Sequence, residues 1–234
     1  MATTLTRLLE TTLPAKTAGS TAKSCLPAGL SKNDINGLKH LFVADARSVT
    51  AGFQISDFNR AQIADLFRWC IADPTGRHDP ERGLWLWGSI GSGKSTLLEI
   101  VRRFCGRLPW RRTADSRGYR SPYSFRTSNA VTVCAEFQQR GFAGIETFID
   151  SPRQAFDELG SETIPTGYYG TSENVFQYIL QRRYDNRHDS FTHVTTNLSE
   201  HQIGSAYGAR IYDRCKEMFN FIEISGPSHR KKFR

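Results

Sequence analysis

The stretch GLWLWGSIGSGKSTLLEIVRRF, from Gly83 to Phe104, decides the fold of this chain. Residues 84–87 are apolar and predict a buried β-strand, whereas the apolar residues after Gly93 recur at helical spacing. Between the two lies the pattern G-x-x-x-x-G-K-[ST], whose glycines allow backbone N–H groups to surround phosphates at a helix N-terminus. We therefore expect a phosphate-binding loop, the P-loop, between a strand and a helix.

The P-loop residues have separate expected roles. Lys94 is predicted to reach the β- and γ-phosphates of a nucleotide, and the Ser95 hydroxyl is predicted to bind Mg²⁺. The predicted nucleotide-binding residues of the loop are Gly88, Ser89, Ile90, Gly91, Ser92, Gly93, Lys94, Ser95 and Thr96.

Strand and helix patterns alternate along most of the chain. The predicted strands cover residues 84–88, 123–128, 154–158, 190–197 and 219–225. The predicted helices cover residues 57–74, 93–106, 129–140, 172–187 and about 205–218, with Ser128 as a candidate cap, and residues 31–48 contain one short helical candidate. This alternation is typical of an α/β fold, in which helices cover both faces of a parallel sheet.

The first part of the chain has a different composition. Residues 1 to about 32 are rich in Thr, Ser, Ala and Gly and predict a flexible segment. We therefore divide the chain into an N-terminal extension over residues 1–50, a candidate for docking a partner, and one nucleotide-binding domain over residues 51–234.

The charge of the chain favours a polyanionic partner. Its 234 residues carry a net charge of +8, and arginines gather at 102–126 among Trp110, Tyr119 and Tyr123. A second basic run, HRKKFR, ends the chain at 229–234. Because arginines beside aromatic rings bind the backbone and stack on the bases of nucleic acids, we expect DNA contact from these segments.

Other classes of protein are not favoured. The apolar runs are too short to span a bilayer and the N-terminus lacks a secretory signal pattern, so we expect a cytoplasmic protein with no membrane partner. The cysteines occur singly, without C-x-x-C pairs or zinc-ligand spacing, so we expect reduced thiols and no zinc site. They are Cys25, Cys70, Cys105, Cys134 and Cys215.

Polar residues end two of the predicted strands. Asp157 and Glu158 lie at the end of one strand, where the first acid can hold Mg²⁺ and the second can polarise an attacking water. An exposed acidic turn is the alternative interpretation. Asn197 ends the next strand and is a candidate to orient the water, although it would also suit the cap of a helix that begins near Ser199.

Three arginines are candidates for charge neutralisation. Arg210 and Arg214 lie on one face of a predicted helix, and an exposed arginine can enter the active site of a neighbouring copy. A surface ion pair with Asp213 is the alternative. Arg230 is a candidate to contact the same nucleotide within its own chain.

The order of these motifs resembles a known family. FDELG (156–160), YGTSENVFQYILQRRYD (169–185), TTNLS (195–199), YGARIYDRC (207–215) and SHR (228–230) follow the P-loop in this sequence. They resemble the DnaC/IstB class of AAA+ ATPases, which contains bacterial helicase loaders and the ATPase partners of insertion-sequence transposases. The resemblance implies an AAA+ P-loop NTPase fold, a parallel β-sheet core flanked by helices, with a short flexible or helical N-terminal extension.

The resemblance also implies roles for individual residues. Asp157 and Glu158 would form the Walker B pair, Asn197 the first sensor and Arg230 the second sensor. Arg214 is favoured as the arginine finger, with Arg210 next.

The resemblance implies cofactors and partners as well. It implies ATP with Mg²⁺, and a homo-oligomer whose ATP sites are shared between copies. It further implies contact with DNA, for which we favour single strands over duplex. We favour a replicative helicase as the protein partner over a transposase, so the predicted function is that of a helicase loader.

Other functions remain to be distinguished. A small-molecule kinase would use the same loop, and a DNA-binding adaptor with very slow hydrolysis would share all of these motifs. The N-K-x-D motif of GTPases and the L-S-G-G-Q motif of transporter ATPases are absent from the sequence.

Overall fold

The computed structural model describes residues 30–114 and 120–226, with side chains left undescribed over 112–122. The chain separates into two compact units. We call the first the helical unit; it contains the described residues up to Glu81 together with Thr96–Ser124. The second, the sheet unit, contains Arg82–Ser95 and the described residues from Phe125 onward. Arg230 and residues 1–29 of the predicted extension lie outside the described residues, and the predicted boundary at residue 50 stays a prediction.

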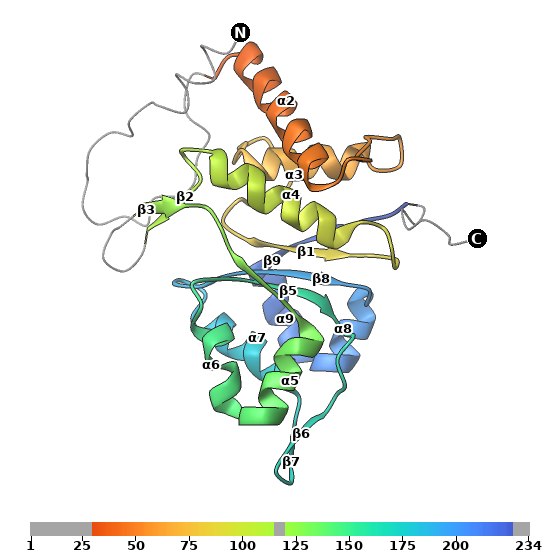
Figure 1. Cartoon of the computed structure of the whole chain (residues 1–234), viewed down its shortest axis with the longest axis vertical. Coiled ribbons are helices and arrows are strands. Elements are labelled where there is room, and N and C mark those ends of the chain that lie inside the picture. Colours follow the sequence, from red (N-terminus) through yellow and green to blue (C-terminus); the bar gives the residue numbers. More distant parts are fainter. Residues whose placement is uncertain (1–29, 115–119, 227–234) are drawn as a thin grey trace. The chain divides into compact units, whose positions relative to one another are not determined.

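The sheet unit is built on a parallel sheet (Figure 1). Every pair of neighbouring strands runs parallel, so the carboxyl ends of the strands share one edge. The strands, in spatial order, are β4 (Arg126–Asn129), β5 (Arg153–Leu159), β8 (Phe191–Thr196), β1 (Gly83–Trp87) and β9 (Phe219–Glu223). The parallel sheet predicted from the alternating patterns is therefore confirmed.

The helices of the sheet unit lie on one side of this sheet in Figure 1. The side chains of Trp85, Phe156 and Val194 belong to the same buried cluster as the apolar faces of these helices. The helices are α5 (Ala130–Arg140), α6 (Phe142–Asp150), α7 (Val175–Asp185), α8 (Glu200–Tyr207) and α9 (Ala209–Met218). Burial of this large apolar surface is the main stabilisation of the sheet unit.

Two details of the predicted helices are corrected. The helix predicted over 205–218 is two helices, because Gly208 adopts a positive φ of 91° and α8 begins earlier, at a capping box on Ser199. The cap of α5 is Asn129 rather than Ser128, since the Asn129 side chain accepts a hydrogen bond from the Val131 N–H. Helix α6 has no counterpart among the predictions.

A hairpin that the sequence patterns did not predict follows β5. It pairs β6 (Thr166–Tyr168) with β7 (Thr171–Glu173), antiparallel. Tyr169 and Gly170, with φ of 40° and 83°, form its two-residue turn. This hairpin extends away from the sheet in Figure 1.

The helical unit has its own core. It contains α2 (Lys32–Val49), α3 (Arg60–Cys70) and the greater part of α4 (Lys94–Arg107), with the short pair β2 (Arg112–Ala114) and β3 (Arg120–Pro122). The rings of Phe42, Phe67 and Phe104 meet within it at centroid distances of 5.1–5.9 Å. Offset and edge contacts of this kind stabilise aromatic cores.

Two expectations about composition can be compared with the structure. Cys70, Cys105, Cys134 and Cys215 are buried free thiols, and Cys25 lies outside the described residues. Burial raises the pKa of Cys134 to about 11 and that of Cys215 to about 12. Within the described ranges, no helix is both long enough and apolar enough to span a bilayer.

Candidate nucleotide site

The P-loop follows β1 at the carboxyl edge of the sheet. Gly88, Gly91 and Gly93 adopt positive φ values of 141°, 82° and 93°. A Cβ on Gly88 would lie 2.4 Å from the carbonyl oxygen of Ile224, so the first turn of the loop requires glycine. The glycines of the motif therefore occupy backbone conformations that other residues rarely adopt, as the motif predicts.

Lys94 connects the P-loop to the end of β8. Its side chain is buried, and its Nζ donates hydrogen bonds to the carbonyl oxygens of Gly88 (2.9 Å) and Ser89 (2.7 Å). The same Nζ donates to Oδ1 of Asn197 at 2.7 Å. Two side chains that the sequence places 103 positions apart, and that we predicted for one site, are thus in direct contact.

Ser95 lies against the acidic end of β5. Its Oγ donates to Oδ1 of Asp157 at 2.7 Å, and the Thr195 hydroxyl donates to the same carboxylate oxygen. Oxygen atoms, such as those of carboxylates and hydroxyls, are the ligands that Mg²⁺ prefers in proteins. This set of oxygens fits the predicted magnesium ligands Ser95 and Asp157.

Glu158 lies in an unusual backbone conformation. Its φ is 59°, in the left-handed region, at an irregularity of the β5–β8 pairing between Phe156 and Leu159. Such a conformation costs on the order of 1 kcal/mol or more and is commonly found at functional sites. The Thr195 hydroxyl accepts a hydrogen bond from the Glu158 N–H at 3.0 Å.

Asn129 holds the side chain of Glu158. Its Nδ2 donates to Oε2 of Glu158 at 2.9 Å, while its Oδ1 caps helix α5. Neither Asn129 nor Thr195 was predicted as a site residue from the sequence. A signal for Asn129 existed, because it is a polar residue at the end of a predicted strand, like Asn197.

The turn after the acidic pair is tied to helix α8. The Ser161 hydroxyl donates to the Glu158 carbonyl at 2.6 Å, and the Gly160 N–H donates to Glu162 at 2.7 Å. The buried Tyr207 hydroxyl also donates to Glu162, at 2.5 Å. Burial, reinforced by the Glu162 carboxylate, raises the pKa of Tyr207, so that the tyrosine remains a hydrogen-bond donor.

The candidate arginine fingers lie on α9. Arg210 is exposed, whereas Arg214 is half-buried with its guanidinium carbon 4.8 Å from the ring centre of Tyr184. The Asp213 carboxylate, which we considered as a partner for these arginines, lies 3.9 Å from Nζ of Lys216. The assignment of either arginine to a neighbouring site stays a prediction, as does that of Arg230.

One part of the predicted DNA-binding segment is internal to the helical unit. Arg111 is 1% exposed, donates to the carbonyls of Pro80 and Trp69, and stacks over the Trp69 ring at 4.3 Å. Tyr123 is buried beside it. The expectation that the arginines and aromatic rings of this segment face DNA is therefore wrong for Arg111 and Tyr123, because contacts distant in sequence bury them.

The order of the strands and the places of the motifs define the fold. A parallel sheet flanked by helices, with the P-loop after β1, the acidic pair on β5 and Asn197 after the intervening β8, is the P-loop NTPase fold of the AAA+ type. This confirms the fold class predicted from the sequence.

Solved structures agree with this classification. The DnaC helicase loader is similar to this chain with a TM-score of 0.53 and 20% identity, over 76% of this chain and 96% of that one. A candidate primosome component from Streptococcus pyogenes serotype M3 is similar with a TM-score of 0.51 and 17% identity, over 75% and 84% of the two chains. No family model and no curated protein matches the chain. The predicted resemblance to DnaC-type AAA+ proteins is thus confirmed in the fold.

Proposed function

We propose that this chain is a magnesium-dependent AAA+ ATPase that acts on DNA as a helicase loader. The observation that carries the proposal is the convergence of Lys94, Ser95, Asp157, Glu158 and Asn197 at one edge of the parallel sheet. Ligands of open α/β sheets bind at the carboxyl ends of the strands, which is where these side chains meet.

The chemistry assigned to each residue follows from its contacts. Phosphate oxygens of ATP would replace the carbonyls of Gly88 and Ser89 as acceptors for Lys94. Ser95 and Asp157 would hold Mg²⁺, which neutralises charge on the phosphates when it is bound. Glu158, oriented by Asn129, would polarise the attacking water, and Asn197 would position it.

An arginine from a neighbouring copy completes the proposed site. The resemblance favours Arg214, and the exposure of Arg210 supports testing both. The stacking of Arg214 on Tyr184 implies that this contact must break, or that the two side chains move together, when copies assemble. Hydrolysis would then report on assembly.

A mixing experiment tests the shared site. Glu158→Gln protein keeps its arginines, and Arg214→Ala protein keeps its Glu158, so a mixture of two inactive proteins should recover part of the ATP hydrolysis. A mixture of Glu158→Gln with Lys94→Ala, in which neither copy has an intact site, is the matched control and should stay inactive. The Arg210→Ala protein is mixed in parallel. Absence of recovery with both arginine variants would contradict the shared site.

DNA and a helicase are the proposed targets. The net charge of +8 and the similarity in fold to the DnaC helicase loader support them. Capture of partners from the native host by the Glu158→Gln protein, with ATP and Mg²⁺, tests the choice. A replicative helicase among the captured proteins would support a loader, whereas a transposase would replace it by a transposition ATPase. Phosphate transfer to a metabolite by a monomer would indicate a kinase.

A further inference from the structure

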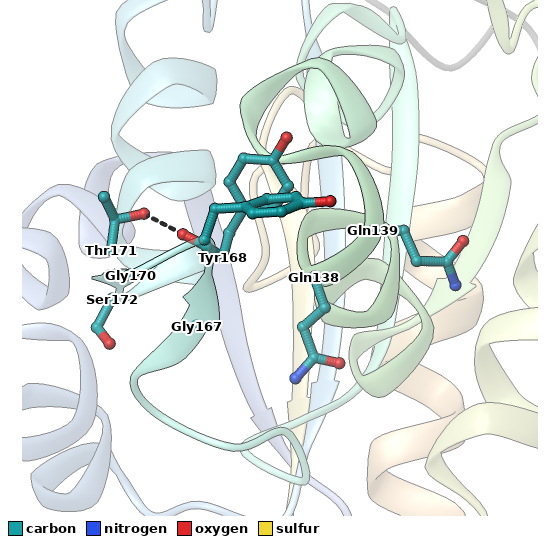
Figure 2. Close-up of a pocket in the computed structure, with 8 residues that line it drawn as sticks. Gln138, Gln139, Gly167, Tyr168, Gly170, Thr171 and Ser172 are labelled. Carbon is teal, nitrogen blue, oxygen red and sulfur yellow. Dashed lines mark hydrogen bonds between the residues drawn. The ribbon is translucent and has the colours of Figure 1, made fainter.

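The β6–β7 hairpin and helix α5 border a wide-open pocket in the sheet unit (Figure 2). Its volume is about 610 Å³, enough for a ligand of the size of one or more nucleobases. The side chains that line it include Gln138, Gln139, Tyr168, Tyr169, Thr171 and Ser172. None of the eight described residues that line this pocket is charged.

Tyr169 is the most unusual of these residues. Its side chain is 91% exposed and its φ of 40° lies in the left-handed region, so it contributes little to packing and occupies a position that suits Asn or Gly better. A strained backbone position that presents a large exposed ring is an outlier of the kind that clusters at ligand-binding sites.

Tyr168 provides a rigid support for Tyr169. Its ring lies 5.9 Å from that of Phe137, and a Cβ on Gly141 would approach it to 2.7 Å, so the C-terminal end of α5 and the glycine after it fix the ring. Tyr169 meets it edge to face at 4.8 Å. The Thr171 hydroxyl donates to the Tyr168 carbonyl at 2.7 Å and fixes the turn (Figure 2). The exposed ring is therefore held on a preorganised hairpin.

The other groups of the pocket suit the edges of nucleobases. Gln138 and Gln139 carry both donors and acceptors, which flat heterocycles can meet in several orientations. An uncharged lining does not provide a phosphate site, but Arg140 follows directly in sequence and is exposed. Base stacking on an aromatic ring next to a cation is how proteins bind single strands without reading their sequence.

We propose that this pocket binds the bases of a single-stranded nucleic acid, with Tyr169 as the stacking platform. The inference deepens the proposed function, on which it rests for the choice of DNA as the target. It also provides an exposed aromatic ring in place of the buried Tyr123.

Fluorescence anisotropy of the full chain with a labelled oligothymidine tests the proposal. Tyr169→Ala should weaken binding about tenfold, since one stacked base contributes about that factor, whereas Tyr169→Phe should stay within about twofold. Phe58→Ala is the matched control, because Phe58 is an exposed aromatic residue of the helical unit. It should leave binding unchanged.

An abasic oligonucleotide separates bases from backbone. The loss caused by Tyr169→Ala should disappear on this probe, because no base remains to stack. Binding of oligothymidine by Tyr169→Ala at the wild-type affinity would overturn the proposal, as would an equal loss on the abasic probe.

ATP hydrolysis without DNA is measured on the same proteins and distinguishes the two proposals. Tyr169→Ala should hydrolyse ATP at the wild-type rate. If wild-type protein hydrolyses ATP but does not bind the oligonucleotide, the stacking site is contradicted and the proposed ATPase activity is supported. If Tyr169 supports binding but neither wild-type protein nor any variant hydrolyses ATP, the proposed ATPase activity is contradicted and the stacking site is supported.

Discussion

Lys94 and Arg183 are both buried cations of the sheet unit, but their partners differ in kind. Lys94 donates to two carbonyls of a glycine-rich loop and to the side chain of Asn197. The Arg183 guanidinium donates to four backbone carbonyls, those of Phe148, Ile149, Ser151 and Phe191, and to the Thr192 hydroxyl. A loop can exchange its contacts for those of a ligand, whereas the end of a helix and the start of a strand cannot.

The two cations therefore serve different purposes. Arg183 satisfies carbonyls at the C-terminal end of α6 that would otherwise be buried without a donor. Burial lowers the pKa of Arg183 to about 10, which leaves it charged at neutral pH. We conclude that Arg183 stabilises the fold, and we propose that Lys94 exchanges its present acceptors for those of a bound nucleotide.

The largest effect is expected for Arg183→Met. The substitution keeps an unbranched aliphatic stem but removes every hydrogen-bond donor, and each buried acceptor left unsatisfied costs about 1–3 kcal/mol. We expect the free energy of unfolding, measured by urea denaturation, to fall by at least ~4 kcal/mol. Arg182→Met, on the exposed side of the same helix, should change it by less than ~0.5 kcal/mol. Equal effects of the two substitutions would contradict the structural role of Arg183.

Lys94→Ala should weaken ATP binding strongly and change the stability of the fold little, the opposite of what we expect for Arg183→Met. It removes the charge that we assign to the phosphates, so ATP affinity measured by calorimetry should fall at least ~100-fold, a change of about 2.7 kcal/mol. Its present acceptors are loop groups that water can reach when the side chain is gone, so the free energy of unfolding should change by less than ~1 kcal/mol. If Lys94→Ala lowered the free energy of unfolding as much as Arg183→Met does, the assignment of different roles to the two cations would be contradicted.

Asn129→Asp is expected to have a smaller effect and to sharpen the account of Glu158. An aspartate keeps the cap of α5, so the stability should stay within ~0.5 kcal/mol. It places a second carboxylate beside Glu158, whose repulsion should lower the ATP hydrolysis rate about tenfold. Asn129→Ser keeps a cap and removes the amide donor without adding charge, so it separates loss of the Glu158 contact from the repulsion. Unchanged hydrolysis in Asn129→Asp would remove Asn129 from the proposed mechanism.

The parts of the site that could be predicted are those that a short sequence motif or the end of a strand marks. The P-loop carries its own signature, and Asp157 and Asn197 follow recognisable strands. In a parallel sheet the carboxyl ends of the strands lie at one edge, whatever the length and conformation of the loops between them. This is why Lys94, Ser95, Asp157 and Asn197 could be predicted to meet.

The residues that were missed depend on contacts between distant segments. Asn129 was predicted as the first residue of a helix, and its bond to Glu158 requires the pairing of β4 with β5. Arg111 was predicted to face DNA because it lies in an arginine-rich segment. The contacts that bury it are with Trp69 and Pro80, at least 31 residues away in sequence, and the local pattern does not reveal them. The hairpin at Tyr169 lacked the Asn-Gly or Gly-Gly turn that makes such a structure visible in sequence.

The most direct test of the central claim compares wild-type and Glu158→Gln proteins in two assays, ATP binding and phosphate release. The account predicts that both proteins bind ATP with Mg²⁺ at similar affinity and that Glu158→Gln releases phosphate at least ~100-fold more slowly, the loss typical of a missing general base. Equal phosphate release by the two proteins, or failure of the wild-type protein to bind ATP, would contradict it.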